Sequence, residues 1–325
     1  MKKLNYLIFL GLIIILGLAS SFPVLAYQIE NLTLPPAETI AGGRGDFVLG
    51  PGKVELWLEP GEKFTKYLNI TNRLGRTIKF KIEIEDFVGT YNVDTTVQLL
   101  GGRESPYSLK DYLDPEITEF TLENGQRITL PVEIAIPEDT EPGGLYGSVL
   151  VSTQALEAGP EETQIKSISR LGSLFFIRVK GDVLEQGFLK SFTTPEKFYK
   201  KGPIDFEILF ENTGNVHLNP YGIIEIKNLL GQKIDEIELE PWFAMPDSLR
   251  LRETKWEREW LFGRYTATAK INRGYQDIID EKSIVFWIIP WKIILPGFII
   301  LVIIIGLFKW IFSHFEIRRK SAAAP

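Results

Sequence analysis

The chain has 325 residues, of which 45% are hydrophobic and 24% are charged, and its formal net charge is −6. Because it has no cysteine, it excludes disulfides, thiolate metal sites and a thiol nucleophile. Residues 27–283 are strongly acidic, since Asp and Glu outnumber Lys and Arg there. An acidic surface repels phosphate backbones, so we expect no nucleic-acid partner.

The first predicted element is a secretory signal over residues 1–26. Two lysines precede an apolar run over 6–18, and Val24 and Ala26 supply small residues before a cut at Tyr27. An uncleaved signal anchor is the alternative, because the apolar run is long. With either outcome, the sequence predicts that the segment after the signal is exported.

A lead-in and a first domain follow the signal. Residues 27–52 contain Pro-Pro, Gly-Gly and Gly-Pro-Gly sequences and little periodic pattern, so we expect a loose lead-in there. Residues 53–183 alternate with period two, which predicts a first β-sandwich with an apolar inner face. Within it, 105–114 is expected to be helical. The predicted inner-face residues are Phe80, Ile82, Ile84, Ile128, Leu130, Val132, Ile134 and Ile136.

A second predicted β-sandwich covers residues 184–286. Short strands separated by turns, with no helix of crossover length between them, favour antiparallel sandwiches over βαβ units. Residues 66–72 and 207–213 each end a strand on an Asn turn. This indicates either a duplicated unit or only the small set of residue types that commonly end strands. The predicted inner-face residues are Phe206, Ile208, Phe210, Ile224, Ile226, Tyr265, Ala267, Ala269 and Ile271.

The last predicted elements are a transmembrane helix over 291–312 and a basic cytoplasmic tail over 313–325. The stretch from 293 to 308 has no charge, and tryptophans and lysines flank it at both ends. Indole rings suit the two membrane interfaces, and a positive tail favours the cytoplasmic side. The predicted fold class is all-β, with two immunoglobulin-like β-sandwich domains plus one C-terminal transmembrane helix. The predicted location is a cell membrane, with the N-terminus extracellular and the C-terminus cytoplasmic.

Several short motifs of the two predicted domains resemble one family. In the first domain they are Glu59 to Glu62, Leu68 to Asn72, Ile84 to Phe87, Ser108 to Tyr112, Pro142 to Val149 and Arg170 to Leu174. In the second domain they are Asn212 to Val216, Pro220, Gly222, Met245 to Ser248, Trp256 and Leu261 to Tyr265. In this order they resemble the WxL-interacting cell-surface proteins of Gram-positive bacteria. The resemblance implies a first domain that binds peptidoglycan and a second that binds an extracellular protein.

Catalytic groups are scarce in this sequence. It has two histidines, His217 and His314, and the predicted span separates them, so no His-based triad or metal cluster is expected. We expect His217 to be a solvated turn residue. Acidic pairs are numerous, but their places on outward strand positions and in turns are typical of solvating charge. The sequence therefore predicts no enzyme activity, no metal and no cofactor.

Aromatic residues outside the predicted strands are the candidate binding residues. Aromatic faces on loops suit sugar rings or protein partners. The alternative is that these rings close the open ends of the sandwiches. The candidates are Tyr107, Tyr112, Trp242, Trp256 and Trp260.

Three functions compete at this point. The leading hypothesis is a membrane-anchored surface protein whose two sandwiches bind cell-wall polymer or a secreted surface protein. The second is a chaperone-like or assembly subunit that caps other secreted chains by pairing with a sheet edge. The third, a hydrolase of wall polymer, has no recognisable cleft signature.

Overall fold

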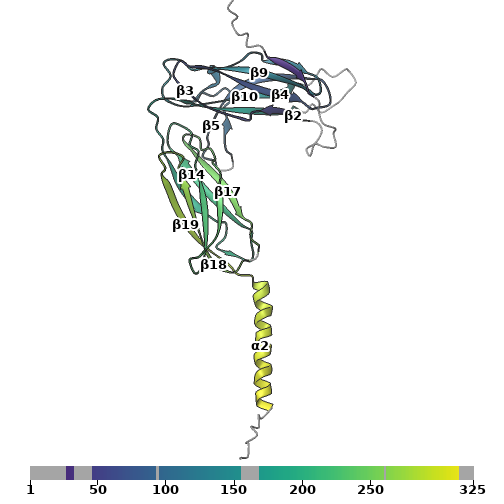
Figure 1. Cartoon of the computed structure of the whole chain (residues 1–325), viewed down its shortest axis with the longest axis vertical. Helices are drawn as coiled ribbons and strands as arrows, with labels where there is room; N and C mark the ends of the chain where they lie inside the picture. Colours follow the sequence, from purple (N-terminus) through teal and green to yellow (C-terminus); the bar gives the residue numbers. More distant parts are fainter. Residues whose placement is uncertain (1–26, 33–45, 93–94, 155–167, 260, 315–325) are drawn as a thin grey trace, which may run out of the picture. The chain divides into compact units, whose positions relative to one another are not determined.

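The computed structural model describes residues 27–32, 46–92, 95–154, 168–259 and 261–314 (Figure 1). The predicted signal and residues 315–325 of the predicted tail lie outside the described part. The chain divides into two compact units. Unit 1 holds Met1–Val88 with Gln98–Leu184, and unit 2 holds Gly89–Val97 with Glu185–Pro325. Both are built mainly of β-strands, as the sequence predicted.

Unit 1 is built from two sheets. One has the order β1-β9-β4-β2, with β7 pairing β9, and the other has the order β3-β11-β10-β5-β6, with β8 pairing β5. Neighbouring strands are antiparallel except for β3 and β11, which run parallel. The strands are β1 (Gln28–Asn31), β2 (Phe47–Gly50), β3 (Lys53–Leu58), β4 (Lys63–Asn72), β5 (Ile78–Val88), β6 (Gln98–Leu99), β7 (Leu113–Pro115), β8 (Glu119–Leu122), β9 (Gln126–Ala135), β10 (Gly143–Gln154) and β11 (Arg170–Val179).

The core of unit 1 lies between these sheets. Ile70 of β4 and Ile128 of β9 share one buried cluster with Phe80 of β5 and Val149 of β10. The predicted inner-face residues of β9 are all buried, which confirms the period-two interpretation there. Ile84 is only partly buried, and it packs against the rim of this cluster.

The expected lead-in over 27–52 is wrong in part. Residues 28–31 form β1, which pairs β9, and residues 47–50 form β2, which pairs β4. Each strand has four residues, and β1 is exposed along its whole length. Strand β1 is held mainly by backbone hydrogen bonds, whereas β2 also packs Phe47 and Leu49 onto the core of unit 1. In a strand of four residues this alternation is too short to identify the strand from the sequence.

The expected helix over 105–114 is largely an ordered loop. Only a short 3₁₀ helix, η1 (Lys110–Tyr112), forms there. The loop is held by the fully buried carboxylate of Asp86, which accepts hydrogen bonds from the Ser108 hydroxyl and from the backbone N–H groups of Leu109 and Lys110 at 2.9 and 2.8 Å. These three donors satisfy a charge that would otherwise be costly to bury.

Unit 2 also has two sheets, with the orders β12-β14-β17 and β13-β19-β18-β15-β16. Among the described strand pairs of unit 2, β13 and β19 are parallel and the others are antiparallel. The strands are β12 (Gly187–Thr193), β13 (Phe198–Tyr199), β14 (Ile204–Asn212), β15 (Tyr221–Asn228), β16 (Lys233–Leu239), β17 (Ser248–Trp256), β18 (Gly263–Asn272) and β19 (Ile279–Ile288).

The core of unit 2 confirms the predicted inner faces. All nine predicted residues, from Phe206 to Ile271, are buried between the two sheets. Four of its rings pack edge to face or stacked around Phe286, which lies 5.8 Å from Phe206 and 5.9 Å from Tyr265 between ring centroids. Aromatic pairs in this arrangement add stability beyond the area they bury.

The two units share one topology. In unit 1, β2 pairs antiparallel with β4 in one sheet and β3, which follows it, pairs parallel with β11 of the other sheet. In unit 2, β12 and β13 pair in the same way with β14 and β19, as in an immunoglobulin-like sandwich. The sheet positions of β4, β9, β10 and β11 correspond to those of β14, β17, β18 and β19.

Two buried asparagines make the same hydrogen bonds at the ends of β4 and β14. Asn72 Nδ2 donates to the carbonyls of Arg76 and Leu122 at 2.8 and 2.9 Å, and its Oδ1 accepts from Leu74 N–H at 3.0 Å. Asn212 Nδ2 donates to the carbonyls of Val216 and Ala244, each at 2.9 Å, and its Oδ1 accepts from Gly214 N–H at 2.9 Å. The shared Asn turns of the sequence therefore correspond to one repeated structural device.

The helix α2 (Trp291–His314) follows β19 in the sequence. It forms where a span over 291–312 was expected. Among the described residues, however, no helix has both the length and the apolarity that crossing a membrane requires.

Candidate functional site

The candidate site lies on β17, the last strand of the smaller sheet of unit 2. On one side β17 pairs with β14 along its whole length, from Asn212 opposite Ser248 to Ile204 opposite Trp256. On its other side the described residues contribute no strand. Instead, Leu249 N–H donates to the Thr90 carbonyl at 3.2 Å, which places this N–H on the outer side of β17.

This hydrogen bond identifies which backbone groups of β17 face outward. Successive residues of a strand direct their N–H and C=O groups to opposite sides, so the groups of Leu251, Glu253 and Lys255 face away from β14 like those of Leu249. Three successive outward positions thus form an open pairing edge. An open edge of this kind is a template for another extended chain.

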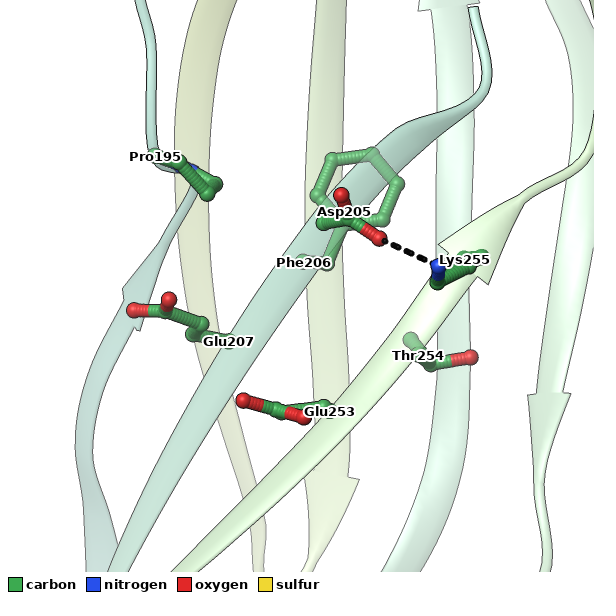
Figure 2. A pocket seen from close by; sticks show the side chains of 7 residues that line it. All are labelled: Pro195, Asp205, Phe206, Glu207, Glu253, Thr254 and Lys255. Atoms are coloured by element: carbon green, nitrogen blue, oxygen red, sulfur yellow. Dashed lines mark ion pairs between the residues drawn. The ribbon is translucent and has the colours of Figure 1, made fainter.

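The solvent face of the β14–β17 ribbon carries an open hollow of about 490 Å³ (Figure 2). Glu207 of β14 lies directly opposite Glu253 of β17, and beside them Asp205 forms an ion pair with Lys255 at 3.4 Å. Like charges placed directly opposite on a sheet are destabilising. Because Asp205, Glu207 and Glu253 line the hollow with only Lys255 to balance them, it has a local excess of negative charge next to the open edge.

The core-facing side of β17 carries two arginines. Arg250 lies opposite Phe210 and Arg252 opposite Ile208, and both of these partners are fully buried core residues. Antiparallel partners lie on the same face of a sheet, so the two arginines point toward the interior of the sandwich at its edge. The Nε atom of each is buried and has no hydrogen-bond partner within the described part of the chain.

The surroundings of the two arginines are poor in negative charge. Arg250 donates from Nη1 to the Thr96 hydroxyl and lies over the Phe243 ring, 5.6 Å from its centroid. Burial lowers the pKa of the Arg250 guanidinium, and the positive charge of Arg252 lowers it further. Among the described ion pairs, none involves either arginine. The two Nε groups, which have no partner in the described part of the chain, are thus available as donors for an anion.

The sequence did not mark Arg250 and Arg252 as candidates. In Leu249-Arg250-Leu251-Arg252 the period-two rule would turn the leucines inward and the arginines outward. The pairing register with β14 instead turns the arginines inward and the leucines outward. A register shift of one residue would exchange the two faces. The alternation itself was visible, but the direction of each side chain was not.

The structure places the predicted tryptophans in the core. Trp242 is 5% exposed and Trp256 is 2% exposed, and the Trp256 ring packs on Tyr265. Trp256 Nε1 donates to Asp235 Oδ2 at 2.8 Å, and this hydrogen bond is the main cause that lowers the pKa of Asp235. Both indoles thus fill the sandwich, which is the alternative that the sequence left open. Trp260 lies outside the described residues.

The tyrosines of the first domain are partly buried. Tyr107 packs edge to face on Tyr146, with 6.1 Å between ring centroids, and Tyr112 packs against the unit 1 core. A ligand role for these two stays a prediction. The expectation for His217 is wrong, since its side chain is 4% exposed. The Asn-rich turn around it folds onto the unit instead of facing solvent.

Metal-binding geometry is also absent from the described residues. No group of three or more His, Cys, Asp or Glu side chains there could hold a metal ion. The predicted lack of enzyme activity stays a prediction.

No family model and no curated protein matches this chain. Among solved structures it is similar to the class 5 fimbriae chaperone CfaA, with 12% identity and a TM-score of 0.38 over 75% of this chain and 100% of the other. It is also similar to the E. coli chaperone DraB, with 13% identity and a TM-score of 0.33 over 73% and 98%. It is similar as well to the structure of the Salmonella enterica SafA pilin in complex with the SafB chaperone. The identity is 12% and the TM-score 0.35, over 75% of this chain and 99% of the other.

TM-scores this low support no conclusion about the activity or partner of this chain. None of these three structures is a WxL-interacting protein. The resemblance to that family stays a prediction.

Proposed function

We propose that this protein is an exported, membrane-held binding or assembly protein that takes an extended segment of another secreted chain onto the β17 edge of unit 2. This is the second of the functions that the sequence suggested. Its two immunoglobulin-like sandwiches supply rigid scaffolds, and sites on regular strands hold their geometry better than sites on loops.

One observation supports the proposal above all, the open outer edge of β17. Its backbone groups at Leu251, Glu253 and Lys255 face away from β14, with no strand of the described residues beside them. Strand addition uses such groups for affinity and the flanking side chains for specificity. The corresponding strand β9 of unit 1 already has β1 and β7 on its outer side, so unit 2 offers the freer edge.

A proline on the outer edge tests the proposal without disturbing the pairing with β14. Unit 1 carries such a residue naturally, since Pro131 of β9 lies at the place that corresponds to Glu253. Glu253→Pro removes one outward N–H, and a proline on an edge strand is tolerated where its N–H would face solvent. Glu253→Gln is the matched control, because it removes the same charge and keeps the N–H.

The measurement is site-specific photo-crosslinking in the native host. With a photo-reactive residue at Lys255 in the full chain, we expect crosslinks to one defined segment of a secreted protein. Glu253→Pro should reduce their yield at least about tenfold, while Glu253→Gln should leave the yield within about twofold. Equal yields in both variants would exclude strand addition at β17.

The other partner expected from the sequence, cell-wall polymer, stays a prediction. The burial of Trp242 and Trp256 removes two of the five aromatic candidates for it, and the family resemblance that also implies it stays a prediction. Binding of the full chain in detergent to purified sacculi would measure it. Retention that competes with soluble wall fragments would support it.

The proposed location is a cell membrane, with the two units outside. The described apolar side chains of α2 are exposed, among them Phe298, Leu301 and Ile305, and so much apolar surface needs a cover. Trp291 and Trp310 near its two ends are residues that suit membrane interfaces. The full chain should stay with membranes in alkaline carbonate, whereas a chain that ends at Ile288 should be released.

A further inference from the structure

We infer that Arg250 and Arg252 form a carboxylate-binding site on the β17 edge, which selects extended segments that carry acidic side chains at alternate positions. The inference rests on the proposed function, because it names the chemistry of the strand that β17 would accept. It assigns a ligand class to two arginines whose Nε groups have no hydrogen-bond partner among the described residues.

The first argument is the kind of polar group left without a partner. Four buried side-chain N or O atoms lack a hydrogen-bond partner in the described part of the chain. Three of them are N–H donors between residues 242 and 252, namely Trp242 Nε1, Arg250 Nε and Arg252 Nε. A buried donor without a partner costs about 1–3 kcal/mol, so the two arginine donors, which lie two residues apart on β17, favour a ligand that only accepts hydrogen bonds.

The second argument is the nature of the corresponding positions in unit 1. Arg250 and Arg252 occupy the places that Ile128 and Leu130 hold on β9, opposite the equivalent strands β4 and β14. Ile128 and Leu130 are fully buried. The fold therefore accepts aliphatic residues at these two places, and unit 2 carries two charged donors there instead.

The third argument is geometric. Residues two apart on a strand are separated by about 6.6 Å and lie on the same face, so the two guanidinium groups repeat with the side-chain period of any strand added to β17. Opposite charges that face each other across paired strands are stabilising. A guanidinium also matches the planar, two-oxygen geometry of a carboxylate, which favours Asp and Glu over uncharged acceptors.

The flanking charges set the register of such a segment. Asp235 of β16 already accepts a hydrogen bond from Trp256 Nε1 and forms an ion pair with Arg258. On the solvent face, Glu207 and Glu253 repel further acids. An added strand therefore places its acidic side chains toward the core-facing side and its uncharged ones toward the hollow.

A competing explanation is that inward arginines protect an exposed edge from pairing with any other strand. It makes the opposite prediction, because arginines that act as blockers should strengthen strand binding when they are removed. Binding of defined peptides separates the two explanations.

The experiment uses fluorescein-labelled octapeptides and the full chain in detergent, with fluorescence anisotropy as the readout. One peptide alternates valine and glutamate, and its partner alternates valine and glutamine. We expect the glutamate peptide to bind at least tenfold more tightly, a difference of about 1.4 kcal/mol. Arg250→Gln with Arg252→Gln should abolish this preference and leave the affinity for the glutamine peptide unchanged.

Two further variants and one measurement of folding control the result. Arg264→Gln, an arginine on β18, should keep the preference. Arg250→Lys with Arg252→Lys keeps both charges without the planar fork and should retain part of it. Because loss of the arginines could unfold unit 2, hydrogen exchange of β14 and β18 must stay unchanged in every variant that is scored.

The outcomes distinguish this inference from the proposed function. If the native chain binds both peptides equally and Glu253→Pro weakens both, strand addition stands and the carboxylate site is overturned. If the double glutamine variant keeps the tenfold preference or binds more tightly, the site is overturned as well. Binding of neither peptide by the native chain would overturn both.

Discussion

Strands β9 and β17 occupy the same place in two sandwiches of one topology, yet they differ on the outer edge and on the inward face. β9 has neighbours on both sides and turns Ile128, Leu130, Val132 and Ile134 into its core, where all four are fully buried. β17 has β14 on one side and turns two arginines, Thr254 and Trp256 inward. The strand with an open edge is the one with polar inward residues.

The difference shows that topology and inward chemistry can vary separately. Asn72 and Asn212 keep the same hydrogen bonds in both units, so the strand ends are equivalent. A strand covered on both edges is enclosed and must be apolar. A strand at an open edge has solvent or a ligand beside it, so its inward side chains can carry charge and be used for recognition.

The largest expected effect comes from moving the inward charge of unit 2 into unit 1. Leu130→Arg puts a guanidinium into a fully enclosed position, where an unpaired charge is destabilising by more than about 4 kcal/mol. Hydrogen exchange should report loss of protection in unit 1 while unit 2 keeps its own. A folded unit 1 in this variant would show that the core near β9 is as open as the β17 edge.

The two asparagines should contribute equally to the two units. Asn72→Ala and Asn212→Ala each remove three hydrogen bonds of a fully buried side chain and leave two carbonyls without that donor. We expect each to cost about 2–4 kcal/mol in its own unit. Urea denaturation followed by hydrogen exchange of each unit measures both, and a difference above about 2 kcal/mol would contradict the equivalence.

Hydrogen exchange should also report the difference between the two edges directly. The amides of Arg127 and Thr129 face β1, so they are expected to be protected, whereas those of Leu251 and Glu253 face no strand of the described residues. We expect at least about a hundredfold slower exchange for the unit 1 amides. Equal rates would mean that the β17 edge is covered in solution.

The opposite substitution, which puts an aliphatic residue in place of an inward arginine of unit 2, should be mildly stabilising. Arg252→Leu gives β17 the residue that Leu130 supplies to β9, and replacing a poorly compensated charge by an aliphatic side chain is expected to add about 1–2 kcal/mol. The urea midpoint of unit 2 measures the gain. A loss of stability would indicate that the arginine is already well satisfied in the native state.

The smallest effect concerns the solvent faces, where the two units behave alike. Hydrogen bonds from Lys227 and Lys270 lower the pKa of Glu225 in unit 2 to about 2, and Lys81 likewise lowers the pKa of Glu83 in unit 1. A lowered pKa gives a contribution to stability that is complete above the unfolded value and is lost as the pH falls toward the folded one. Carboxyl NMR should show Glu225 titrating near 2, and Lys270→Met should raise its pKa.

Much of the fold was predictable because its cores follow a local period. The inner faces of β9, β14, β15 and β18 were read correctly from alternation, since burial of one face of a strand requires apolar residues at every second position. The strand-ending asparagines were also visible, because a turn needs a side chain that bonds to its own backbone nearby.

The failures share one physical cause, which is contact between residues far apart in the sequence. The 105–114 stretch contains the residues of a short helix, but Asp86 binds its backbone from another strand. The short strands β1 and β2 are held by pairing with β9 and β4, and only β2 has apolar residues, Phe47 and Leu49, that reach the core. The sequence predicted Trp242 and Trp256 as aromatic residues on loops, but both are buried in the core between the two sheets.

By itself, the sequence determined the class of the fold, the two sandwiches and the lack of thiol chemistry, because composition and period-two burial are local properties of the chain. Only the tertiary structure decided which edge stays open and which way Leu249-Arg250-Leu251-Arg252 turns. A one-residue shift of register against β14 would exchange those faces, and only the pairing with β14 selects between them.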